Sequence, residues 1–139
     1  MAKVLTIKEV EISAHEMAKF MMSWNEPIPD FNSRFPGVLE SCLNTPFQTF
    51  NKNALYRGLV SQAAILFYLL IKNHPFQNGN KRIAVTCLFI FLDKNKKWIK
   101  TSSEELYNFA VWIAQSSPKL KVYVIEAIKN FIRKNIVNL

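Results

Sequence analysis

Apolar residues recur at helical spacing along most of this chain. The clearest case is residues 54–73, whose apolar side chains fall on one helical face at positions i, i+4, i+7 and i+11: Leu59, Ala63, Leu66 and Leu70. Apolar neighbours widen this face, so we expect a central, buried helix. The helix should end near Asn73, because His74 precedes Pro75 and the residue before a proline is disfavoured in helical conformation.

Further helices are predicted on both sides of this segment. Residues 13–22 are amphipathic, and residues 80–92 are almost as apolar as 54–73. The lysine-rich segment 93–97 should end the second of these, since cations are favourable at a helix C-terminus. Ser102 and Glu105 form the capping-box pattern S-x-x-E, which opens another helix. Its apolar stripe is Leu106, Phe109, Ala110 and Ile113.

A last helix is expected over residues 119–136. Its apolar face is Leu120, Val124, Ala127, Ile128 and Phe131. Because no alternation of strands and helices is visible, the predicted fold class is all-α, a helical bundle around two buried helices, organised as a single domain over residues 1–139.

The segment before residue 54 is less regular. Pro27, Pro29, Pro36 and Gly37 indicate a connector without regular helix. Farther on, three residues close to Pro46 have strand-like character: Phe47, Thr49 and Phe50. They predict a small β-hairpin, a possible flap, with ordinary packing as the equal alternative.

Charge narrows the range of partners. The 139 residues carry a formal net charge of +8, and no Asp or Glu occurs between residues 41 and 92. A basic balance favours polyanionic partners such as nucleotides, nucleic acids, acidic proteins or membrane surfaces. The acid-free stretch also fits a buried core segment, but the pair Lys81-Arg82 inside it does not. The cluster Lys94, Lys96, Lys97 and Lys100 is either a solvated face or a surface for an acidic partner.

The compartment can be inferred from what the sequence contains. Cys42 and Cys87 lack C-x-x-C spacing and are expected to be buried free thiols. The N-terminus has no signal-peptide apolar region, and the longest apolar runs are about half of the ~18 residues that a membrane span needs. We therefore expect a cytoplasmic protein without a membrane partner.

The loop between the two most apolar helices has the composition of a phosphate site. Residues 74–82 read His-Pro-Phe-Gln-Asn-Gly-Asn-Lys-Arg. Gly79 can adopt a positive φ and allow close approach of a ligand, and Asn80, Lys81 and Arg82 open the next helix, whose free N–H groups favour an anion. His74 is suited to accept a proton, and Phe76 is expected to anchor the loop in the core.

This segment resembles the signature of the Fic/Doc (Fido-fold) family, H-x-F-x-[DE]-[GA]-N-[GK]-R. The resemblance extends roughly from Gly37 to Leu92. It implies that His74 is the general base that deprotonates a target hydroxyl, that Gly79 and Asn80 form the anion hole for nucleotide phosphates, and that Arg82 grips a phosphate.

Lys81 points to one branch of the family. Adenylyl-transferring Fic enzymes usually have glycine at this position, whereas the death-on-curing (Doc) branch has lysine. The resemblance therefore implies a Doc-like toxin that moves a phosphoryl group from ATP or another nucleoside triphosphate, with Mg²⁺, to a protein hydroxyl. The known target class is elongation factor Tu, and the implied partner is an antitoxin. The alternative is an AMP-transferring Fic enzyme. The segment Phe47, Thr49 and Phe50 falls where the family has its substrate-docking flap.

Asn78 departs from the family pattern. The family has Asp or Glu here as its Mg²⁺ ligand, and an Asn carbonyl lacks the charge that makes carboxylates strong ligands. Three outcomes follow: weak metal binding, metal held mostly by the nucleotide, or impaired activity. A catalytically impaired Fido-fold binding module is thus an alternative function.

Two other interpretations rank lower. Thr101 to Glu105 is the nearest match to the inhibitory helix that some Fic proteins carry, but Leu106 replaces the final Gly or Asn, so we expect no built-in inhibitor. A direct nucleic-acid binder is unlikely to be the main function, because no helix shows a basic stripe with interleaved aromatic residues.

Overall fold

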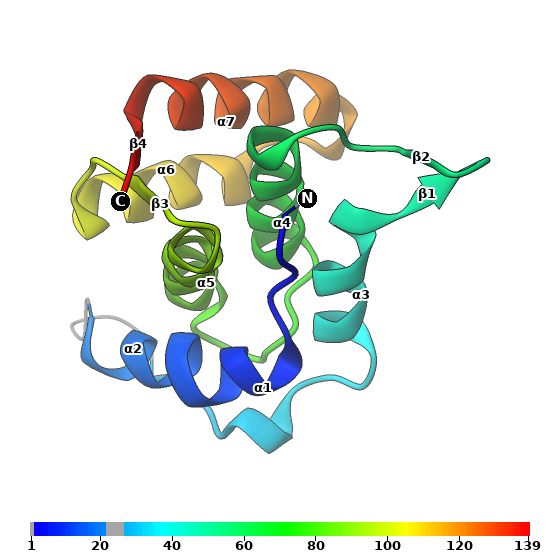
Figure 1. Ribbon diagram of the computed structural model, residues 1–139. Coiled ribbons are helices and arrows are strands. Elements are labelled where there is room, and N and C mark those ends of the chain that lie inside the picture. The colour runs from blue at the N-terminus through cyan, green and yellow to red at the C-terminus, as the bar shows by residue number, and fades with distance from the viewer. Residues whose placement is uncertain (1, 22–26) are drawn as a thin grey trace.

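The computed structural model describes residues 2–21 and 27–139. Its described part is mostly helical, which confirms the predicted all-α class. Two helices form the centre, α4 (Leu59–Lys72) and α5 (Asn80–Lys94), and they pack against each other (Figure 1). In α4 every residue from 63 to 71 is buried, so this helix is surrounded by protein on all sides over most of its length.

The remaining helices surround this pair. α6 (Ser103–Gln115) and α7 (Lys121–Asn135) both pack on α4, and α6 also packs on α5. α3 (Val38–Asn44) covers another side of α4, while α2 (His15–Phe20) packs on α5. Figure 1 shows α7 and the pair α1–α2 on opposite sides of the two central helices.

The N-terminal helical stretch is longer than the sequence pattern predicted. It consists of α1 (Ile7–Glu9), a π-helix (Val10–Ala14) and α2, so it starts six residues before the expected residue 13. A capping box starts it, because the Thr6 hydroxyl accepts the Glu9 N–H and the Glu9 carboxylate accepts the Thr6 N–H. The predicted end at Met22 lies outside the described residues.

The hairpin predicted before α4 is present. β1 (Thr49–Phe50) pairs antiparallel with β2 (Asn53–Ala54), and the two turn residues Asn51 and Lys52 both have positive φ, 50° and 66°. A two-residue turn of this kind matches the twist of the strands it joins. Because the hairpin extends to Ala54, α4 begins at Leu59 and not at residue 54.

The predicted apolar face of residues 119–136 was wrong at Leu120. Leu120 is 48% exposed, because it belongs to a short 3-10 helix (Pro118–Leu120) and α7 begins only at the next residue. The buried residues of α7 are Val124, Ile125, Ile128 and Ile132. A second small sheet was not predicted at all: β3 (Lys97–Ile99) pairs antiparallel with β4 (Ile136–Asn138).

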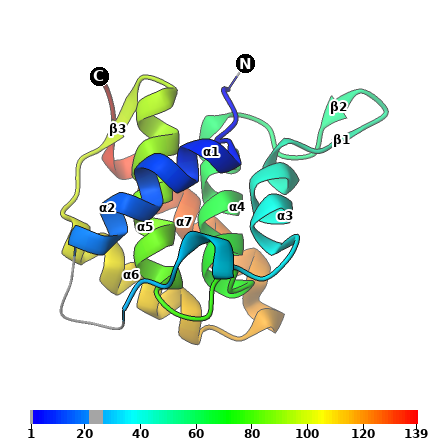
Figure 2. The ribbon, with the colours of Figure 1, turned by 90° about the horizontal axis from the view of Figure 1, so that it is seen from below.

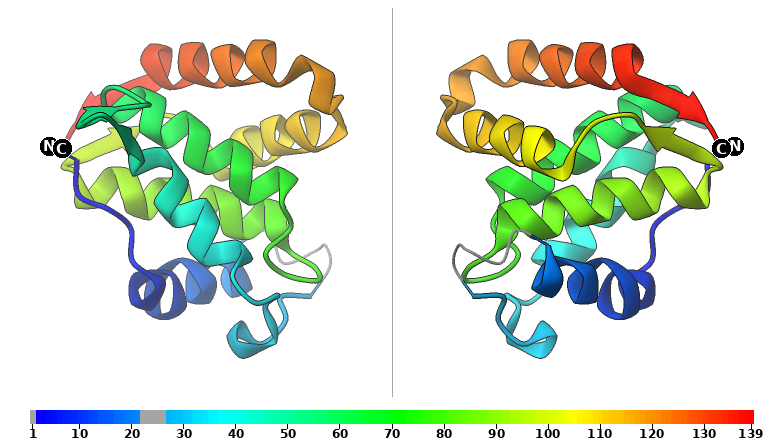
Figure 3. Two further views of the ribbon diagram at one scale, coloured as in Figure 1. Left: turned by 90° about the vertical axis from the view of Figure 1, so that its right-hand side faces the viewer. Right: turned by 90° about the vertical axis from the view of Figure 1, so that its left-hand side faces the viewer.

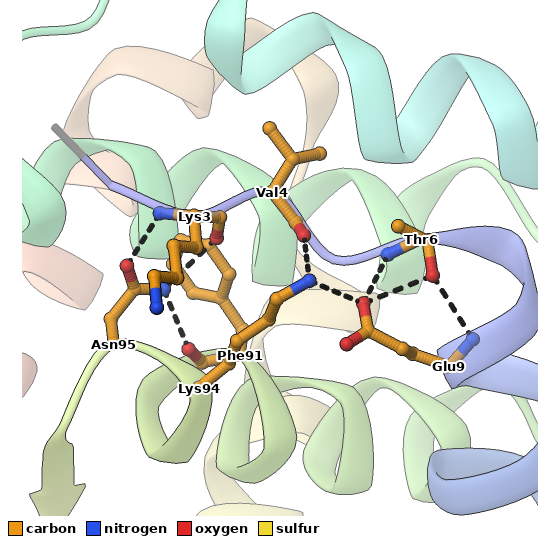
Figure 4. Close-up of polar contacts among 7 residues, drawn as sticks. All are labelled: Lys3, Val4, Thr6, Glu9, Phe91, Lys94 and Asn95. Atoms are coloured by element: carbon orange, nitrogen blue, oxygen red, sulfur yellow. Dashed lines mark hydrogen bonds and ion pairs between the residues drawn. The ribbon is translucent and has the colours of Figure 1, made fainter.

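The N-terminal segment is fastened across the C-terminal end of α5 (Figure 4). The Asn95 side chain accepts the Lys3 N–H and donates to the carbonyls of Lys3 and Phe91. Lys94 Nζ donates to the Val4 carbonyl and lies 2.7 Å from the Glu9 carboxylate. Burial raises the pKa of Glu9, but the hydrogen bonds from Lys94 and Thr6 outweigh it and lower this pKa overall.

Other expectations concern the cysteines and membrane segments. Cys42 and Cys87 are buried free thiols, as predicted, and burial raises the pKa of Cys42 to about 11. Within residues 2–21 and 27–139, no helix combines the length and apolar character that crossing a membrane requires.

Candidate active site

The loop of residues 73–79 joins the C-terminal end of α4 to the start of α5. α4 ends at Lys72 with Asn73 as its C-cap, as the His-Pro sequence predicted. His74, the next residue, has φ +49°, a left-handed conformation that is uncommon outside glycine. Such strained conformations persist only where the surroundings impose them, and they cluster at functional sites.

Asn80 holds the loop in shape. Its Oδ1 accepts the Phe76 N–H at 2.9 Å, and its Nδ2 donates to the Phe76 carbonyl at 2.7 Å. The same Nδ2 lies 3.5 Å from Nδ1 of His74, a contact too long to fix the tautomer of the imidazole. Asn80 is 6% exposed, so its carboxamide is a structural element of the loop as well as the first residue of α5.

Phe76 anchors the loop in an aromatic cluster. It is 1% exposed, and its ring centroid lies 5.6 Å from that of His15 and 5.9 Å from that of Phe31. His15 is fully inside this cluster, where its Nε2 donates to the Pro29 carbonyl at 2.8 Å. Burial lowers the pKa of His15 despite that hydrogen bond, so His15 is neutral near pH 7. No pattern in the sequence indicates that His15 lies behind the loop.

Gly79 is required by both conformation and space. It is the N-cap of α5, with φ +76°. A Cβ atom at this position would lie 2.5 Å from Cδ1 of Ile28, far inside van der Waals contact. The glycine therefore lets the connector that contains Ile28 lie directly against the start of α5.

One small pocket brings several of the predicted residues together. Its volume is about 130 Å³, and its wall contains His74, Asn78, Asn80 and Lys81. Three further lining residues were not predicted from the sequence motif: Ile71, Gln77 and Ala114. Ala114 belongs to α6, so the far wall is supplied by a helix that lies outside the motif.

The start of α5 gives this pocket its electrostatic character. α5 has no side-chain cap and no acidic residue in its first turn. The half-buried Lys81 lines the pocket next to these first backbone N–H groups. A helix N-terminus that carries a lysine and no carboxylate favours an anionic ligand over a cationic one.

Arg82 points in another direction. It is 3% exposed, and its guanidinium donates to the carbonyls of Ala18 and Met21 at 3.3 Å each. These hydrogen bonds connect α5 to the end of α2. Both bonds come from Nη1, and in this conformation they join two helices. The predicted role of Arg82 as a phosphate ligand stays a prediction.

Lys72 fixes the opposite wall of the pocket. Its Nζ donates to the Ser116 carbonyl at 2.5 Å and to the carbonyls of Ile113 and Ala114 at 3.4 Å each. Carbonyls at the C-terminal end of a helix lack partners within the helix, so a cation is favourable there. The last residue of α4 thus holds the end of α6 beside the motif loop.

The predicted flap lies elsewhere in the molecule. The hairpin precedes α4 and the motif loop follows it, so the 14 residues of α4 separate them by about 20 Å. Figures 2 and 3 show the hairpin and the loop at opposite ends of α4. Phe50 is 67% exposed and Thr49 is also exposed, whereas Phe47 packs 5.9 Å from the Phe91 ring. In this conformation none of the three lines the His74 pocket.

At the position where the resemblance implies a metal ligand, this chain has Asn78 in place of a carboxylate. Among the described residues, no group of three or more His, Cys, Asp or Glu side chains is placed to hold a metal ion. The pocket wall offers amide oxygens from Gln77 and Asn78, and Asn80 uses its own on the loop. Because Mg²⁺ sites in proteins depend on one or more carboxylates, these donors do not fit a metal site built by the protein alone.

Comparison with known proteins gives one match. No curated protein and no solved structure matches the chain. The model of the Fic/DOC family matches residues 8–92, which include most of α1, all of α2 to α4, the motif loop and nearly all of α5. The match covers more than half of the chain, so the protein belongs to the Fic/DOC family, whose members generally transfer nucleotide-derived groups to proteins.

Proposed function

We propose that the protein is a Doc-like toxin that transfers a phosphoryl group from ATP, or another nucleoside triphosphate, to a hydroxyl group of a target protein. The observation that carries the proposal is the single pocket shared by His74, Lys81 and the uncapped start of α5. A proton acceptor and an anion-binding helix end open into the same small space, as transfer of a phosphate-derived group requires.

His74 is the proposed base. As the target oxygen attacks the γ-phosphorus, its O–H bond breaks and the proton passes to the imidazole, while the bond from the γ-phosphorus to the bridging oxygen breaks and the nucleoside diphosphate leaves. Transfers of this kind depend on positioning and on neutralising the charge of the phosphate oxygens. In the proposal, the backbone N–H groups at the start of α5 and the Lys81 ammonium supply that neutralisation.

The supporting residues keep these groups in place. Asn80 fixes the loop through Phe76, Gly79 permits the sharp entry into α5, and Arg82 ties α5 to α2. Mg²⁺ would accompany the nucleotide, held by its phosphates, with the Asn78 amide as a weak neutral ligand. The described residues of the pocket wall include no carboxylate that would strengthen this binding.

Lys81 carries the preference for phosphoryl over adenylyl transfer. It lies in the pocket wall, where its charge would meet the phosphate chain of the nucleotide. Elongation factor Tu is the proposed target and a separate antitoxin the proposed inhibitor, with both interactions in the cytoplasm. The segment that resembled an inhibitory helix supports a separate inhibitor: Ser102 caps α6 there, 12 residues before the end of α6 that borders the pocket.

The absence of an acid supports a second candidate. Asn78 lies in the pocket wall where the family motif has Asp or Glu, and none of the described lining residues is acidic. A protein with this wall could bind a nucleotide and a partner without efficient transfer. This candidate is a nucleotide-binding module of the same fold.

A dual-label experiment separates these possibilities. The protein is incubated with Mg²⁺, a target preparation that contains elongation factor Tu, and ATP labelled at either the α- or the γ-phosphorus. Label on protein from γ-ATP alone is the expected result. Label from α-ATP alone would establish adenylyl transfer instead, and ATP binding without label from either would establish the non-catalytic module.

Two variants assign the result to the pocket. His74→Ala should reduce transfer by at least ~100-fold, which is the lower range for loss of a general base, and it should leave ATP binding within about threefold. Asn78→Asp should increase transfer if the missing charge limits metal binding. Lys119→Ala, an exposed change outside the pocket, serves as the control and should match the original protein.

A further inference from the structure

A second and larger cleft lies at the opposite end of α4 from the motif loop. It has a volume of about 450 Å³ and is formed by the first residues of α4 together with β3, β4 and the last turn of α7. An adjoining cavity of about 490 Å³ shares Gly58 and Leu59 with it and continues toward the end of the β1–β2 hairpin. We refer to these two cavities together as the α4 cleft.

The charge of this cleft is positive and largely uncompensated. Of the described residues that line it, Arg57, Lys97 and Arg133 are cationic, and none in either cavity is acidic. Among described residues, Arg57 has no ion-pair partner, and Lys97 donates only to the neutral Asn138. Arg133 faces one carboxylate, the exposed Glu126, at 3.7 Å.

The rest of the wall combines aliphatic side chains with neutral polar ones. Leu59 and Val60 of α4 and Ile136 and Val137 of β4 line the first cavity. β4 pairs with β3 on one edge and has no strand on the other in the described chain. A cleft of this kind, with a strand at its side, matches how proteins take up extended peptides, in which the backbone adds to a strand and alternate side chains enter pockets.

We propose that the α4 cleft binds an extended, acidic segment of a partner protein in which carboxylate and aliphatic side chains alternate. Carboxylates would meet Arg57, Lys97 and Arg133, and the aliphatic side chains would contact the wall between α4 and β4. The volumes of the two adjoining cavities, about 450 and 490 Å³, favour a peptide over a single small anion. A single-stranded nucleic acid is a poorer fit, because its phosphates would leave the aliphatic part of the wall without a partner. Its bases usually stack on aromatic side chains, and none is among the described lining residues.

This inference gives the lysine-rich segment after α5 a specific role. Of the four lysines clustered there, Lys94 is engaged with Glu9 and the N-terminal segment, and Lys97 lies in the cleft. The cleft is separated from His74 by the length of α4, so a partner bound here leaves the motif pocket open. The inference does not depend on which group the His74 pocket transfers.

The test uses the full chain and a panel of fluorescein-labelled decapeptides. In each peptide Glu or Asp alternates with Leu, Ile or Val, and each has a counterpart with Gln or Asn in place of the acids. Fluorescence anisotropy at low and at physiological salt measures binding. The acidic peptides should bind at least ~10-fold more tightly than their neutral counterparts, and physiological salt should weaken them.

Charge-reversal variants locate the site. Arg57→Glu and Arg133→Glu should each weaken the best acidic peptide by about tenfold. Lys119→Glu, the same charge change at an exposed position at the other end of α7, should change binding by less than about twofold. Arg57→Gln removes the charge without reversing it, so it should also weaken binding but with less risk of disturbing the fold. Thermal melting by circular dichroism checks that every variant is folded.

Three results would overturn the proposal. The first is that neutral peptides bind as tightly as acidic ones, or that no peptide of the panel binds. The second is that Lys119→Glu weakens binding as much as Arg57→Glu does, which would show that the peptide responds only to the net charge of the protein. Finally, an oligothymidylate could displace the acidic peptide at lower concentration than an unlabelled acidic peptide does, which would assign the cleft to single-stranded nucleic acid.

Discussion

Gly79 is the residue of the motif at which conformation and packing restrict the side chain most. Gly79→Ala would place a residue with a Cβ at φ +76° and bring that atom to 2.5 Å from Cδ1 of Ile28. The left-handed conformation costs about 1–2 kcal/mol, and overpacking adds about 1–3 kcal/mol. We expect the free energy of unfolding, measured in urea, to fall by about 2–4 kcal/mol and ATP binding to weaken as the loop shifts.

A double mutant separates the two causes. Ile28→Ala removes the atom that a new Cβ would meet but leaves the backbone conformation unchanged. The combination Gly79→Ala/Ile28→Ala should therefore lose less stability than the sum of the single changes, by about 1 kcal/mol or more. Strict additivity would show that the backbone conformation, and not the contact with Ile28, makes glycine necessary.

His15 makes the stability of the loop dependent on pH. Burial holds its pKa below the ordinary 6.5 in the folded chain, so the unfolded chain binds the proton more readily. The free energy of unfolding should therefore fall as pH is lowered from about 7 to about 5. Glu16, Lys19 and Asp30 are the charged groups that act on His15, and burial outweighs them.

The matched variant for this prediction is His15→Phe, which keeps an aromatic ring against Phe31 and Phe76. It loses the hydrogen bond to Pro29, so its stability at pH 7 should be somewhat lower, and its dependence on pH between about 7 and 5 should be flatter. The chain has two histidines, so His74→Ala is the control. An equally steep dependence in His15→Phe would contradict the assignment to His15.

At the scale of helices, Lys72 couples the end of α4 to the end of α6. Lys72→Met keeps most of the aliphatic stem but removes the donor to three carbonyls at the α6 C-terminus. We expect the free energy of unfolding to fall by about 1–3 kcal/mol. ATP affinity should also fall, because Ala114 of α6 forms part of the pocket wall.

Lys129→Met on α7 is the matched control. Lys129 is similarly shielded, with 23% of its side chain exposed, but its nearest partner is the exposed Glu126 at 3.8 Å. Its loss should cost less than about 0.5 kcal/mol. If both variants lost the same stability and the same ATP affinity, the carbonyl contacts of Lys72 would not explain its effect.

The central elements could be predicted because their signals are local. Pro75 ends α4, Gly79 begins α5, and the apolar runs before Pro75 and after Gly79 are long enough to predict helices. The β3–β4 sheet could not be predicted, because its strands are more than 35 residues apart and each is only three residues long. Its pairing depends on how α5 and α7 pack, which no short sequence pattern records.

The direction of the motif side chains was equally beyond the sequence. Lys81 and Arg82 are neighbours at the start of a helix, so they point about 100° apart. The sequence marked both as cations next to an anion site, but it did not indicate that α2 lies behind α5. Only that neighbour explains why Lys81 lines the pocket and Arg82 donates to Ala18 and Met21.

At the scale of the whole molecule, the N-terminal helices serve as a support for α5. Besides receiving Arg82, they accept a hydrogen bond from Thr86 at the Ala14 carbonyl, 2.8 Å away. Farther along α5, the N-terminal segment is held by Lys94 and Asn95 (Figure 4). α5 is therefore fastened to the same N-terminal stretch near its beginning, in its middle and at its end.

A change at Asn95 should weaken the attachment of the N-terminal segment to α5 without altering the His74 pocket. Asn95→Ala removes two hydrogen bonds to Lys3 and one to the Phe91 carbonyl. Asn135→Ala on α7 is a close control, because its side chain makes the same kind of bond to a carbonyl four residues earlier, that of Phe131, and holds no other segment in the described contacts. Each variant should lose about 1 kcal/mol for that shared bond.

The difference between the two variants measures the hold on the N-terminal segment. Asn95→Ala should lose about 1–2 kcal/mol more than Asn135→Ala in urea unfolding, and hydrogen exchange should accelerate in residues 3–10 in Asn95→Ala alone. ATP affinity should stay within about twofold in both, because Arg82 and Thr86 still hold α2 and the π-helix against α5 near the pocket. If ATP affinity fell together with protection of residues 3–10, the end of α5 and the pocket would form one cooperative unit, and the local fastening at Arg82 would not be enough to keep the motif loop in place.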